Sequence, residues 1–269
     1  MLIQYWSNAY SESHPLVLRV AGRLATLEFG SNADDPEITT LGVFRKELTD
    51  SQVEPLIRSV SSAAFLSLPK PEPVPPGEVV RRITITDTSG EVVKYAAGGQ
   101  PTEQAFDAAE RLVLSLVEAV RTSPVSTFSV GIEGEPTYSH GVLEILVHIS
   151  NTGPEVIYLH DPRVWAEKGV ALVLRIVRET ADSDDSVVGD QVFVDLEGGD
   201  VTAKGLASVS RETIAIPPGG RLLLSFRPKP RLQNGSYELQ VALTAPLLSL
   251  DGTELILCEA FSLPTRVRL

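Results

Sequence analysis

The second half of the chain is a succession of short apolar runs, each bounded by residues that favour turns. The turn sequences are Asn151-Thr152-Gly153-Pro154, Pro217-Pro218-Gly219-Gly220, Asn234-Gly235 and Asp251-Gly252. Short strands at such spacing, with no convincing helix between them, are typical of a β-sandwich. The expected strands are Phe128–Ile132, Gly141–Ser150, Glu155–Leu159, Ala171–Arg178, Gln191–Leu196, Ser208–Ile216, Arg221–Phe226, Ser236–Leu243 and Glu254–Leu263. We therefore predict an all-β sandwich domain over residues 128–269.

The first half has a mixed pattern of strands and helices. Strand-like runs cover Leu16–Val20, Leu24–Phe29 and Gly42–Leu48. Val79–Thr86 and Glu91–Ala97 flank a turn of sequence Asp-Thr-Ser-Gly, which predicts a hairpin. The pattern changes near residues 122–127, around Ser123-Pro124. These features predict an α+β domain over residues 1–123, with two helices packed on one face of a small antiparallel sheet.

Two stretches of the first half have helical signals. The first helix should begin near Thr49–Ser51, where Thr49 with Gln52, or Ser51 with Glu54, could form a capping box. We expect its Pro55 to lie in the first turn, where a missing N–H costs little, and the helix to end before Pro69. The second helix should span Pro101–Arg121. Its polar positions are expected to be Glu103, Asp107, Glu110, Arg111, Glu118 and Arg121.

One acidic segment, Glu179–Asp200, interrupts the strands of the second half. It has no Lys or Arg, and its carboxylates are Glu179, Asp182, Asp184, Asp185, Asp190, Asp195, Glu197 and Asp200. Residues 124–269 hold 19 acidic and 12 basic residues, so this segment supplies nearly all the negative charge of the sandwich. Its Gly189 stands eighth from Asp182, whereas an EF-hand loop needs Gly at the sixth position, so a calcium loop is not predicted.

The acidic segment leaves several interpretations open. It could be a docking surface for a basic protein, a solvated loop or an irregular cation site. It could also neutralise a basic stretch inside the same chain, because residues 201–237 carry six basic residues and one acidic residue. We favour the docking surface for a basic protein. All eight carboxylates are then candidate partner-binding residues, and no metal or cofactor is expected.

Local catalytic signatures do not stand out in the chain. The four histidines (His14, His140, His148 and His160) form no zinc motif, and no P-loop, G-x-S-x-G or G-x-G-x-x-G sequence is present. Ser139-His140 and His160-Asp161 are adjacent pairs, and neighbours on a strand point to opposite faces. We therefore predict a non-enzymatic protein.

Charge and composition restrict the partner and the compartment. The net charge of −12 disfavours binding to nucleic acid and to anionic membranes, and favours a basic protein partner. The single cysteine, Cys258, excludes an internal disulfide and is expected to be a small buried hydrophobe. No secretory signal is evident, and no apolar run approaches the roughly 20 residues that span a bilayer. A cytoplasmic protein is the expectation.

Two family resemblances extend these expectations. The stretches LEILVHISNTGPEVIYL, IPPGGRLLLSF and NGSYELQVAL resemble the Ig-like sandwiches of bacterial intracellular proteins, including the BsuPI type of intracellular proteinase inhibitor, over roughly residues 128–263. The helix-bearing stretch LGVFRKELTDSQVEPLIRSV together with the acidic segment resembles bacterial immunity proteins, including those that neutralise type VI secretion effectors.

The second resemblance implies a protein that binds and neutralises a toxin. A nuclease toxin has a basic substrate groove, and a carboxylate-rich loop could steer association and fill that groove. The alternative is a proteinase-inhibitor-like or adaptor protein that binds through strand edges of the sandwich, such as Leu143–Ile149. A third candidate surface is the aromatic cluster of Tyr5, Trp6 and Tyr10.

Overall fold

The chain forms two compact units made mainly of antiparallel β-strands. The computed structural model describes residues 1–9, 15–33, 35–38, 40–69, 77–98, 103–179, 191–196, 200–202, 207–208, 210–230 and 232–268. Unit 1 consists of Met1–Ser31 and Gly42–Thr127, and unit 2 consists of Asn32–Leu41 and Phe128–Leu269. The predicted β-rich character, with few helices, is confirmed.

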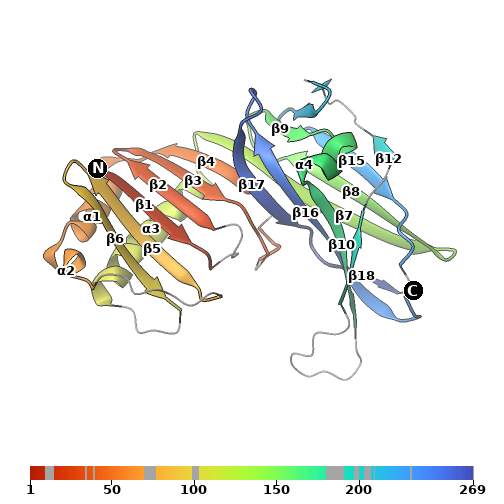
Figure 1. Ribbon diagram of the computed structural model, residues 1–269, viewed down its shortest axis with the longest axis horizontal. Helices are drawn as coiled ribbons and strands as arrows, with labels where there is room; N and C mark the ends of the chain where they lie inside the picture. The colour runs from red at the N-terminus through yellow and green to blue at the C-terminus, as the bar shows by residue number, and fades with distance from the viewer. Residues whose placement is uncertain are drawn as a thin grey trace. The chain divides into compact units, whose positions relative to one another are not determined.

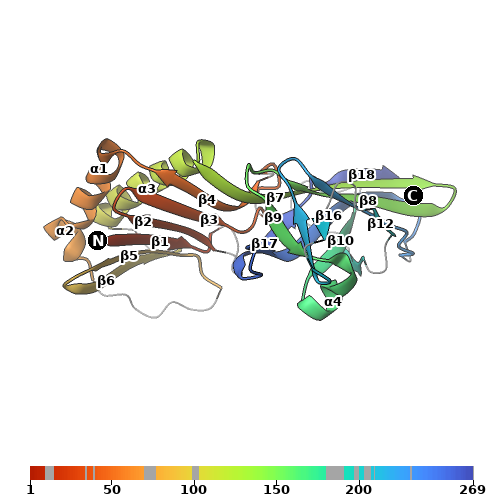
Figure 2. The ribbon, with the colours of Figure 1, turned by 90° about the horizontal axis from the view of Figure 1, so that it is seen from above.

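Unit 1 is an antiparallel sheet with helices on one face. Its strand order is β4-β3-β2-β1-β5-β6. The strands are β1 (Leu2–Ser7), β2 (Leu16–Ala21), β3 (Leu24–Phe29), β4 (Leu41–Glu47), β5 (Val80–Asp87) and β6 (Gly90–Ala97). Figure 2 shows the helices α1 (Asp50–Val60), α2 (Ala63–Leu66) and α3 (Gln104–Thr122) on one side of these strands. Among the described residues, no helix combines the length and the apolar content needed to cross a membrane.

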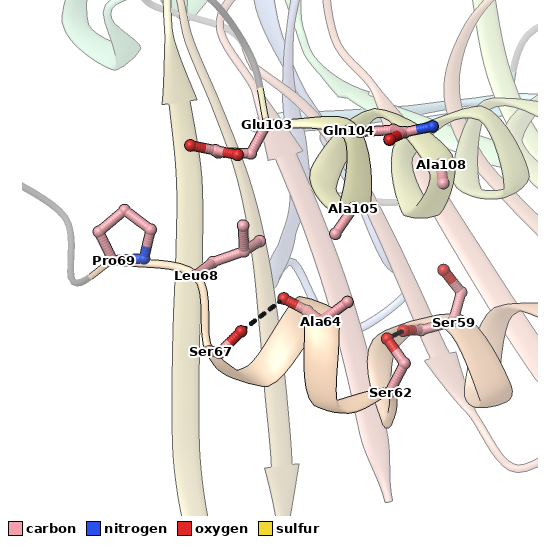
Figure 3. Close-up of a pocket in the computed structure, with 10 residues that line it drawn as sticks. All are labelled: Ser59, Ser62, Ala64, Ser67, Leu68, Pro69, Glu103, Gln104, Ala105 and Ala108. Carbon is pink, nitrogen blue, oxygen red and sulfur yellow. Dashed lines mark hydrogen bonds between the residues drawn. The ribbon is translucent and has the colours of Figure 1, made fainter.

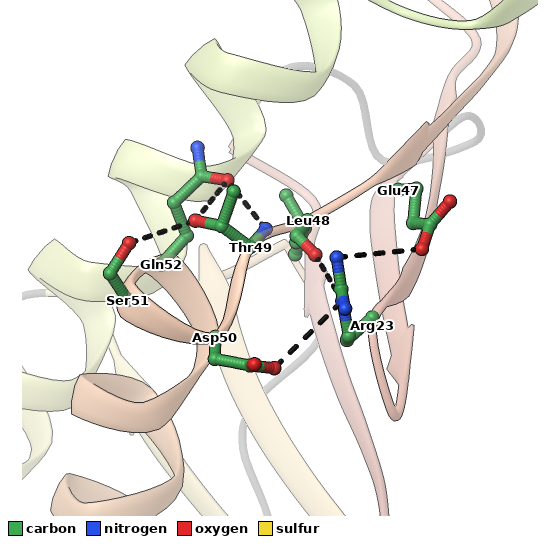
Figure 4. Close-up of polar contacts among 7 residues, drawn as sticks. All are labelled: Arg23, Glu47, Leu48, Thr49, Asp50, Ser51 and Gln52. Atoms are coloured by element: carbon green, nitrogen blue, oxygen red, sulfur yellow. Dashed lines mark hydrogen bonds and ion pairs between the residues drawn. The ribbon is translucent and has the colours of Figure 1, made fainter.

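The start of α1 is held by short polar contacts (Figure 4). The backbone N–H of Thr49 donates to Gln52 Oε1 at 2.9 Å, as expected for the Thr49–Gln52 alternative. Arg23, in the β2–β3 turn, donates from Nε to the carbonyl of Leu48 at 2.9 Å. It also lies 3.5 Å from a carboxylate oxygen of Glu47. The helix start is thereby tied to the neighbouring hairpin.

One detail of the predicted first helix was wrong. Pro55 is the sixth residue of α1, beyond the first turn, so the carbonyl of the exposed Ser51 lacks its usual intrahelical donor. The helix ends at Val60, before Pro69 as expected. Ser62 caps the separate helix α2, because its hydroxyl accepts from the N–H of Phe65 at 3.2 Å.

A buried carboxylate lies between α3 and the sheet. Glu110 was expected on the polar side of its helix, but it is only 5% exposed. Its Oε1 accepts from the Tyr5 hydroxyl at 2.8 Å and its Oε2 from Arg81 Nη1 at 2.7 Å. Burial, and then the charge of Glu110, raise the pKa of Tyr5 above its ordinary value. The cluster joins β1, β5 and α3 through one side chain.

Glu110→Ala should destabilise the protein, because the buried Tyr5 hydroxyl loses its acceptor and Arg81 loses a carboxylate partner. The expected loss in the free energy of unfolding is about 2–4 kcal/mol. Urea unfolding monitored by circular dichroism measures it. Glu118→Ala on the same helix is the matched control. Its exposed pair with Arg121 should contribute at most about 1 kcal/mol. Equal losses for the two variants would contradict the assigned role of Glu110.

Unit 2 contains two groups of antiparallel strands (Figure 1). One has the order β12-β15-β8-β7, and the other has the order β11-β10-β16-β9-β14-β13, with β17 and β18 also paired to β16. The first group is β7 (Ser126–Ser139), β8 (Val142–Asn151), β12 (Asp200–Thr202) and β15 (Arg221–Phe226). The second is β9 (Ile157–His160), β10 (Ala171–Arg178), β11 (Gln191–Asp195), β13 (Ala207–Ser208), β14 (Thr213–Ile216), β16 (Ser236–Leu248), β17 (Glu254–Phe261) and β18 (Thr265–Arg268).

The two groups of strands pack against each other as in a β-sandwich. Ile145 of β8 and Leu174 of β10 are fully buried, and buried residues alternate with more exposed ones along both strands. The two groups approach each other closely at Gly134 of β7. A Cβ at this position would lie 2.6 Å from Cγ2 of Val241 on β16, which is too close for any side chain. Glycine therefore permits the sheets to meet here.

One loop and two short helical segments differ from the simple strand pattern. Asn32 is buried and bonds the backbone of β17, accepting from the N–H of Phe261 at 2.8 Å and donating to its carbonyl at 3.0 Å. The expectation of no helix after residue 127 was wrong. A 3₁₀ turn (Pro162–Val164) and α4 (Trp165–Lys168) follow β9. The buried Trp165 anchors them, because its Nε1 donates to the carbonyl of His160 at 2.8 Å.

Cys258 on β17 is fully buried, as the sequence predicted. Burial raises the pKa of its thiol to about 12. We expect a thiol-reactive dye to label native protein only through unfolding. The labelling rate should therefore follow the unfolded fraction as urea increases. Rapid labelling without urea would contradict the burial of this side chain.

Candidate functional site

The acidic segment is described only in part. Glu179, Asp195 and Asp200 lie in the described part of the chain. Asp182, Asp184, Asp185, Asp190 and Glu197 lie outside the described residues. Their expected part in partner binding therefore stays a prediction.

The three described acidic residues are separated from one another. Asp195 ends β11 and lies opposite Val173 of β10, whereas Glu179 follows Arg178 at the other end of β10. Six residues of strand separate these ends, which corresponds to roughly 20 Å. Asp200 belongs to β12 in the other group of strands, where it lies opposite Ser225. The described acidic residues therefore mark different parts of unit 2.

The basic stretch 201–237 forms its observed ion pairs elsewhere. Arg227 Nε lies 2.7 Å from Glu144 Oε1, and Arg221 Nη1 lies 4.0 Å from Glu133 Oε2. Both glutamates belong to the β7–β8 hairpin. The alternative, in which the acidic segment neutralises this stretch, stays a prediction, because five of the eight acidic residues lie outside the described part of the chain. Lys204 and Arg231 lie outside the described residues.

Glu179 has a partner that the sequence did not indicate. Its Oε1 lies 2.7 Å from Arg266 Nε of β18. The pairing follows from the sheet, because Glu238 of β16 lies between Val177 of β10 on one side and Arg266 on the other. Asp195, in contrast, is exposed, and no ion pair links it to a described residue.

β11 carries exposed apolar side chains within the acidic segment. It is the last strand in its sheet order, with β10 as its only neighbour among the described strands. Phe193 is 65% exposed and Val192 is 41% exposed. Exposed apolar side chains on a strand at the end of a sheet are typical of interaction surfaces. The run Val192-Phe193-Val194 within the acidic segment is the sequence feature from which an exposed apolar strand could have been predicted.

The strand proposed as a binding edge is not an edge. The stretch Leu143–Ile149 lies in β8, which pairs with β15 on one side and with β7 on the other. Its alternating pattern fits an edge strand and a central strand equally well, and only the pairing of distant strands separates the two. Binding through this stretch as a free edge is therefore ruled out.

The histidines and their neighbours do not form catalytic pairs among the described residues. Asp161 accepts from both Nε and Nη2 of Arg163, at 2.8 and 2.7 Å, and its Oδ1 also accepts from the N–H of Arg163. It therefore caps a turn instead of orienting His160. His148 Nε2 lies 4.0 Å from Glu135 Oε1, beyond hydrogen-bond distance. His140 occupies a hairpin turn at φ 53°. No group of three or more potential ligands among the described His, Cys, Asp and Glu residues could hold a metal ion.

A pocket of about 610 Å³ opens in unit 1 between α1, α2 and the start of α3 (Figure 3). Its lining includes Ser59, Ser62, Ser67, Glu103 and Gln104. Two of the serine hydroxyls already donate to helix carbonyls, Ser62 to Ser59 at 2.7 Å and Ser67 to Ala64 at 3.1 Å. These hydroxyls act as helix caps, and no histidine is among the described residues that line the pocket, so none of these lining residues could activate them as a base.

The aromatic and basic clusters near the N-terminus are divided by the sheet. Tyr5 is buried towards α3, whereas its neighbour Trp6 faces the opposite side of β1. Arg82 stacks on Trp6, with its guanidinium carbon 5.3 Å from the ring centroid, while Arg81 points towards Glu110. Tyr10 lies outside the described residues. The aromatic cluster is therefore not one surface.

Comparisons of the chain with protein-family models, with curated proteins and with solved structures found no match.

Asp161→Asn should reveal the structural role of this carboxylate. Hydrogen bonds from Arg163 hold the pKa of Asp161 below its usual range. The contribution of the ionised carboxylate to the free energy of unfolding is therefore complete above the unfolded-state pKa of about 4. It declines as the pH falls through the folded-state pKa. At pH 7 the variant should lose about 1–3 kcal/mol of unfolding free energy.

The difference in unfolding free energy between wild type and Asp161→Asn should be smaller at about pH 3 than at pH 7. Urea unfolding at both pH values measures it. Glu167→Gln, on the exposed face of α4, is the control and should change stability little at either pH. A difference that stays the same across this range would rule out the ionised carboxylate as the source of the stability.

Proposed function

We propose that this chain is a non-enzymatic, cytoplasmic protein-binding module of the immunity type, which binds and neutralises a basic toxin through the segment Glu179–Asp200. The observation that supports the proposal best is the exposure of Asp195, which no ion pair links to another described residue. Arg221 and Arg227 have glutamate partners in the β7–β8 hairpin, outside the acidic segment.

Electrostatics provides the physical reason for this function. A net charge of −12 attracts a basic surface from beyond contact distance, and a dense acidic segment concentrates that field. Such complementarity chiefly raises the association rate and the specificity. A nuclease-type effector, with its groove built for phosphates, is the partner class that we favour.

The architecture proposed with this function has two domains. The β-sandwich-like unit is proposed to be an Ig-like domain, and the helix-bearing unit a separate α+β domain. Antiparallel strands in two packed layers support the first part, and the helices on one face of the unit 1 sheet support the second.

The alternative is a proteinase-inhibitor-like or adaptor protein that binds through strand edges. The stretch Leu143–Ile149 cannot act as a free strand edge, because β8 is paired on both sides. The feature that still favours edge binding is β11 with its exposed Phe193.

The triple variant Asp182→Asn, Asp184→Asn and Asp185→Asn tests the toxin-binding proposal. The probe is a catalytically inactivated nuclease toxin, taken from the neighbouring gene where that gene encodes one. We expect the association rate at low salt to fall by about tenfold and its salt dependence to weaken, because three steering charges are lost. Stopped-flow measurements over a series of salt concentrations give both quantities.

The control removes the same charge from unit 1 by Glu54→Gln, Glu91→Gln and Glu118→Gln, all at exposed positions. It should retain most of the association rate. Equal effects of the two triple variants would reduce the role of the segment to net charge alone. A nuclease that fails to bind wild-type protein would remove the proposal.

A further inference from the structure

The outer edge of β11 has backbone groups that can accept another strand. The N–H of Leu196, the next residue, donates to the carbonyl of Leu172 at 2.8 Å and therefore points towards β10. Backbone groups alternate in direction along an antiparallel strand. The N–H and carbonyl groups of Gln191, Phe193 and Asp195 therefore point away from β10. No other described strand pairs with them.

The sequence of β11 is symmetric in polarity about its central residue. It reads Gln-Val-Phe-Val-Asp, so a polar residue, valine, phenylalanine, valine and a polar residue follow one another. In an antiparallel pair of two copies centred on Phe193, Phe193 lies opposite itself, Val192 opposite Val194, and Gln191 opposite Asp195. Every apolar residue then faces an apolar residue, and no two like charges lie directly opposite.

We propose that β11 is a homodimerisation strand that pairs antiparallel with β11 of a second copy of this chain, about a twofold axis at Phe193. The three outward-facing residues are those that the ladder needs, and they would form about six backbone hydrogen bonds between the copies. This inference is independent of the proposed toxin binding, because the occupant of the edge is the same chain.

The exposed side chains agree with this arrangement on both faces of the strand. Phe193 projects on the face opposite to the core, beside Arg175, and would stack against the Phe193 of the other copy. Val192 lies opposite the buried Ile176 and therefore faces the core side, where it is 41% exposed. Pairing with Val194 of the other copy would cover it. One self-pairing register thus buries both exposed residues.

Features that normally protect an edge strand are missing from the centre of β11. Charged side chains, prolines and bulges keep edge strands from pairing. The three central residues of β11 are Val192, Phe193 and Val194, and its ladder with β10 runs without a register shift. Shifting the self-pairing by two residues would place Phe193 opposite Asp195 in one direction and opposite Gln191 in the other, so either shift replaces the Phe–Phe pair by a mixed pair.

Added salt should have opposite effects on this dimer and on the proposed toxin complex. Two copies that each carry a net charge of −12 repel one another, so added salt should tighten the dimer. The same salt should weaken binding to a basic partner. A small strand interface predicts a reversible dimer whose population rises with protein concentration.

Sedimentation equilibrium of the full chain over a series of concentrations tests the proposal. Wild-type protein should show a monomer–dimer equilibrium, and Phe193→Asp should be monomeric, because it places two carboxylates face to face on the axis. Leu250→Asp is the matched control. This residue of unit 2 is 71% exposed but lies outside β11, and its substitution should leave the dimer unchanged. Circular dichroism confirms that both variants fold.

Two substitutions of Gln191 test the register. Gln191→Glu places a second carboxylate opposite Asp195 in each half of the ladder and should raise the dissociation constant by about three- to tenfold. Gln191→Lys places an ammonium group there and should lower it. Monomeric wild-type protein at all concentrations, a dimer that survives Phe193→Asp, or equal effects of the two Gln191 variants would each overturn the proposal.

Discussion

Antiparallel pairing with one buried face is the constraint on which both units depend. Along β1 and β10, residues that face the core alternate strictly with residues that do not. Each strand therefore presents one side to the core and leaves its other side for polar contacts. The same alternation separates Tyr5 from Trp6, and Arg81 from Arg82, although these residues are neighbours in the chain. Function in such a fold depends on which faces and edges remain uncovered.

Much of the local structure follows from the sequence because it depends on near neighbours. Turn residues and alternating runs predict most of the strands, and the N–H of Thr49 bonds the side chain of Gln52 as the capping signal indicated. The position of Pro55 was missed, because the structure uses Thr49 and not Ser51 as the cap, and this earlier start moves Pro55 beyond the first turn.

Features that depend on distant partners could not be predicted in this way. Glu110 has the spacing of a surface residue, but Tyr5 and Arg81 from other elements make its burial possible. Leu143–Ile149 has the pattern of a strand with one covered face, and only its pairing with β7 and β15 shows that it is central. Arg227 could pair with any nearby acid, and the β7–β8 hairpin brings Glu144 to it. Local periodicity contains none of this information.

The negative charge of the chain and the exposed edge strand β11 have opposite effects on self-association. Like charge keeps copies of an acidic chain apart, whereas an exposed strand with apolar side chains draws them together. In β11 the charge lies at one end, at Asp195, and the centre is apolar. Antiparallel pairing about Phe193 places that carboxylate beside the neutral Gln191 of the other copy. Self-association through this strand thus avoids placing two carboxylates directly opposite each other, and Glu179, held by Arg266, lies beyond the paired residues.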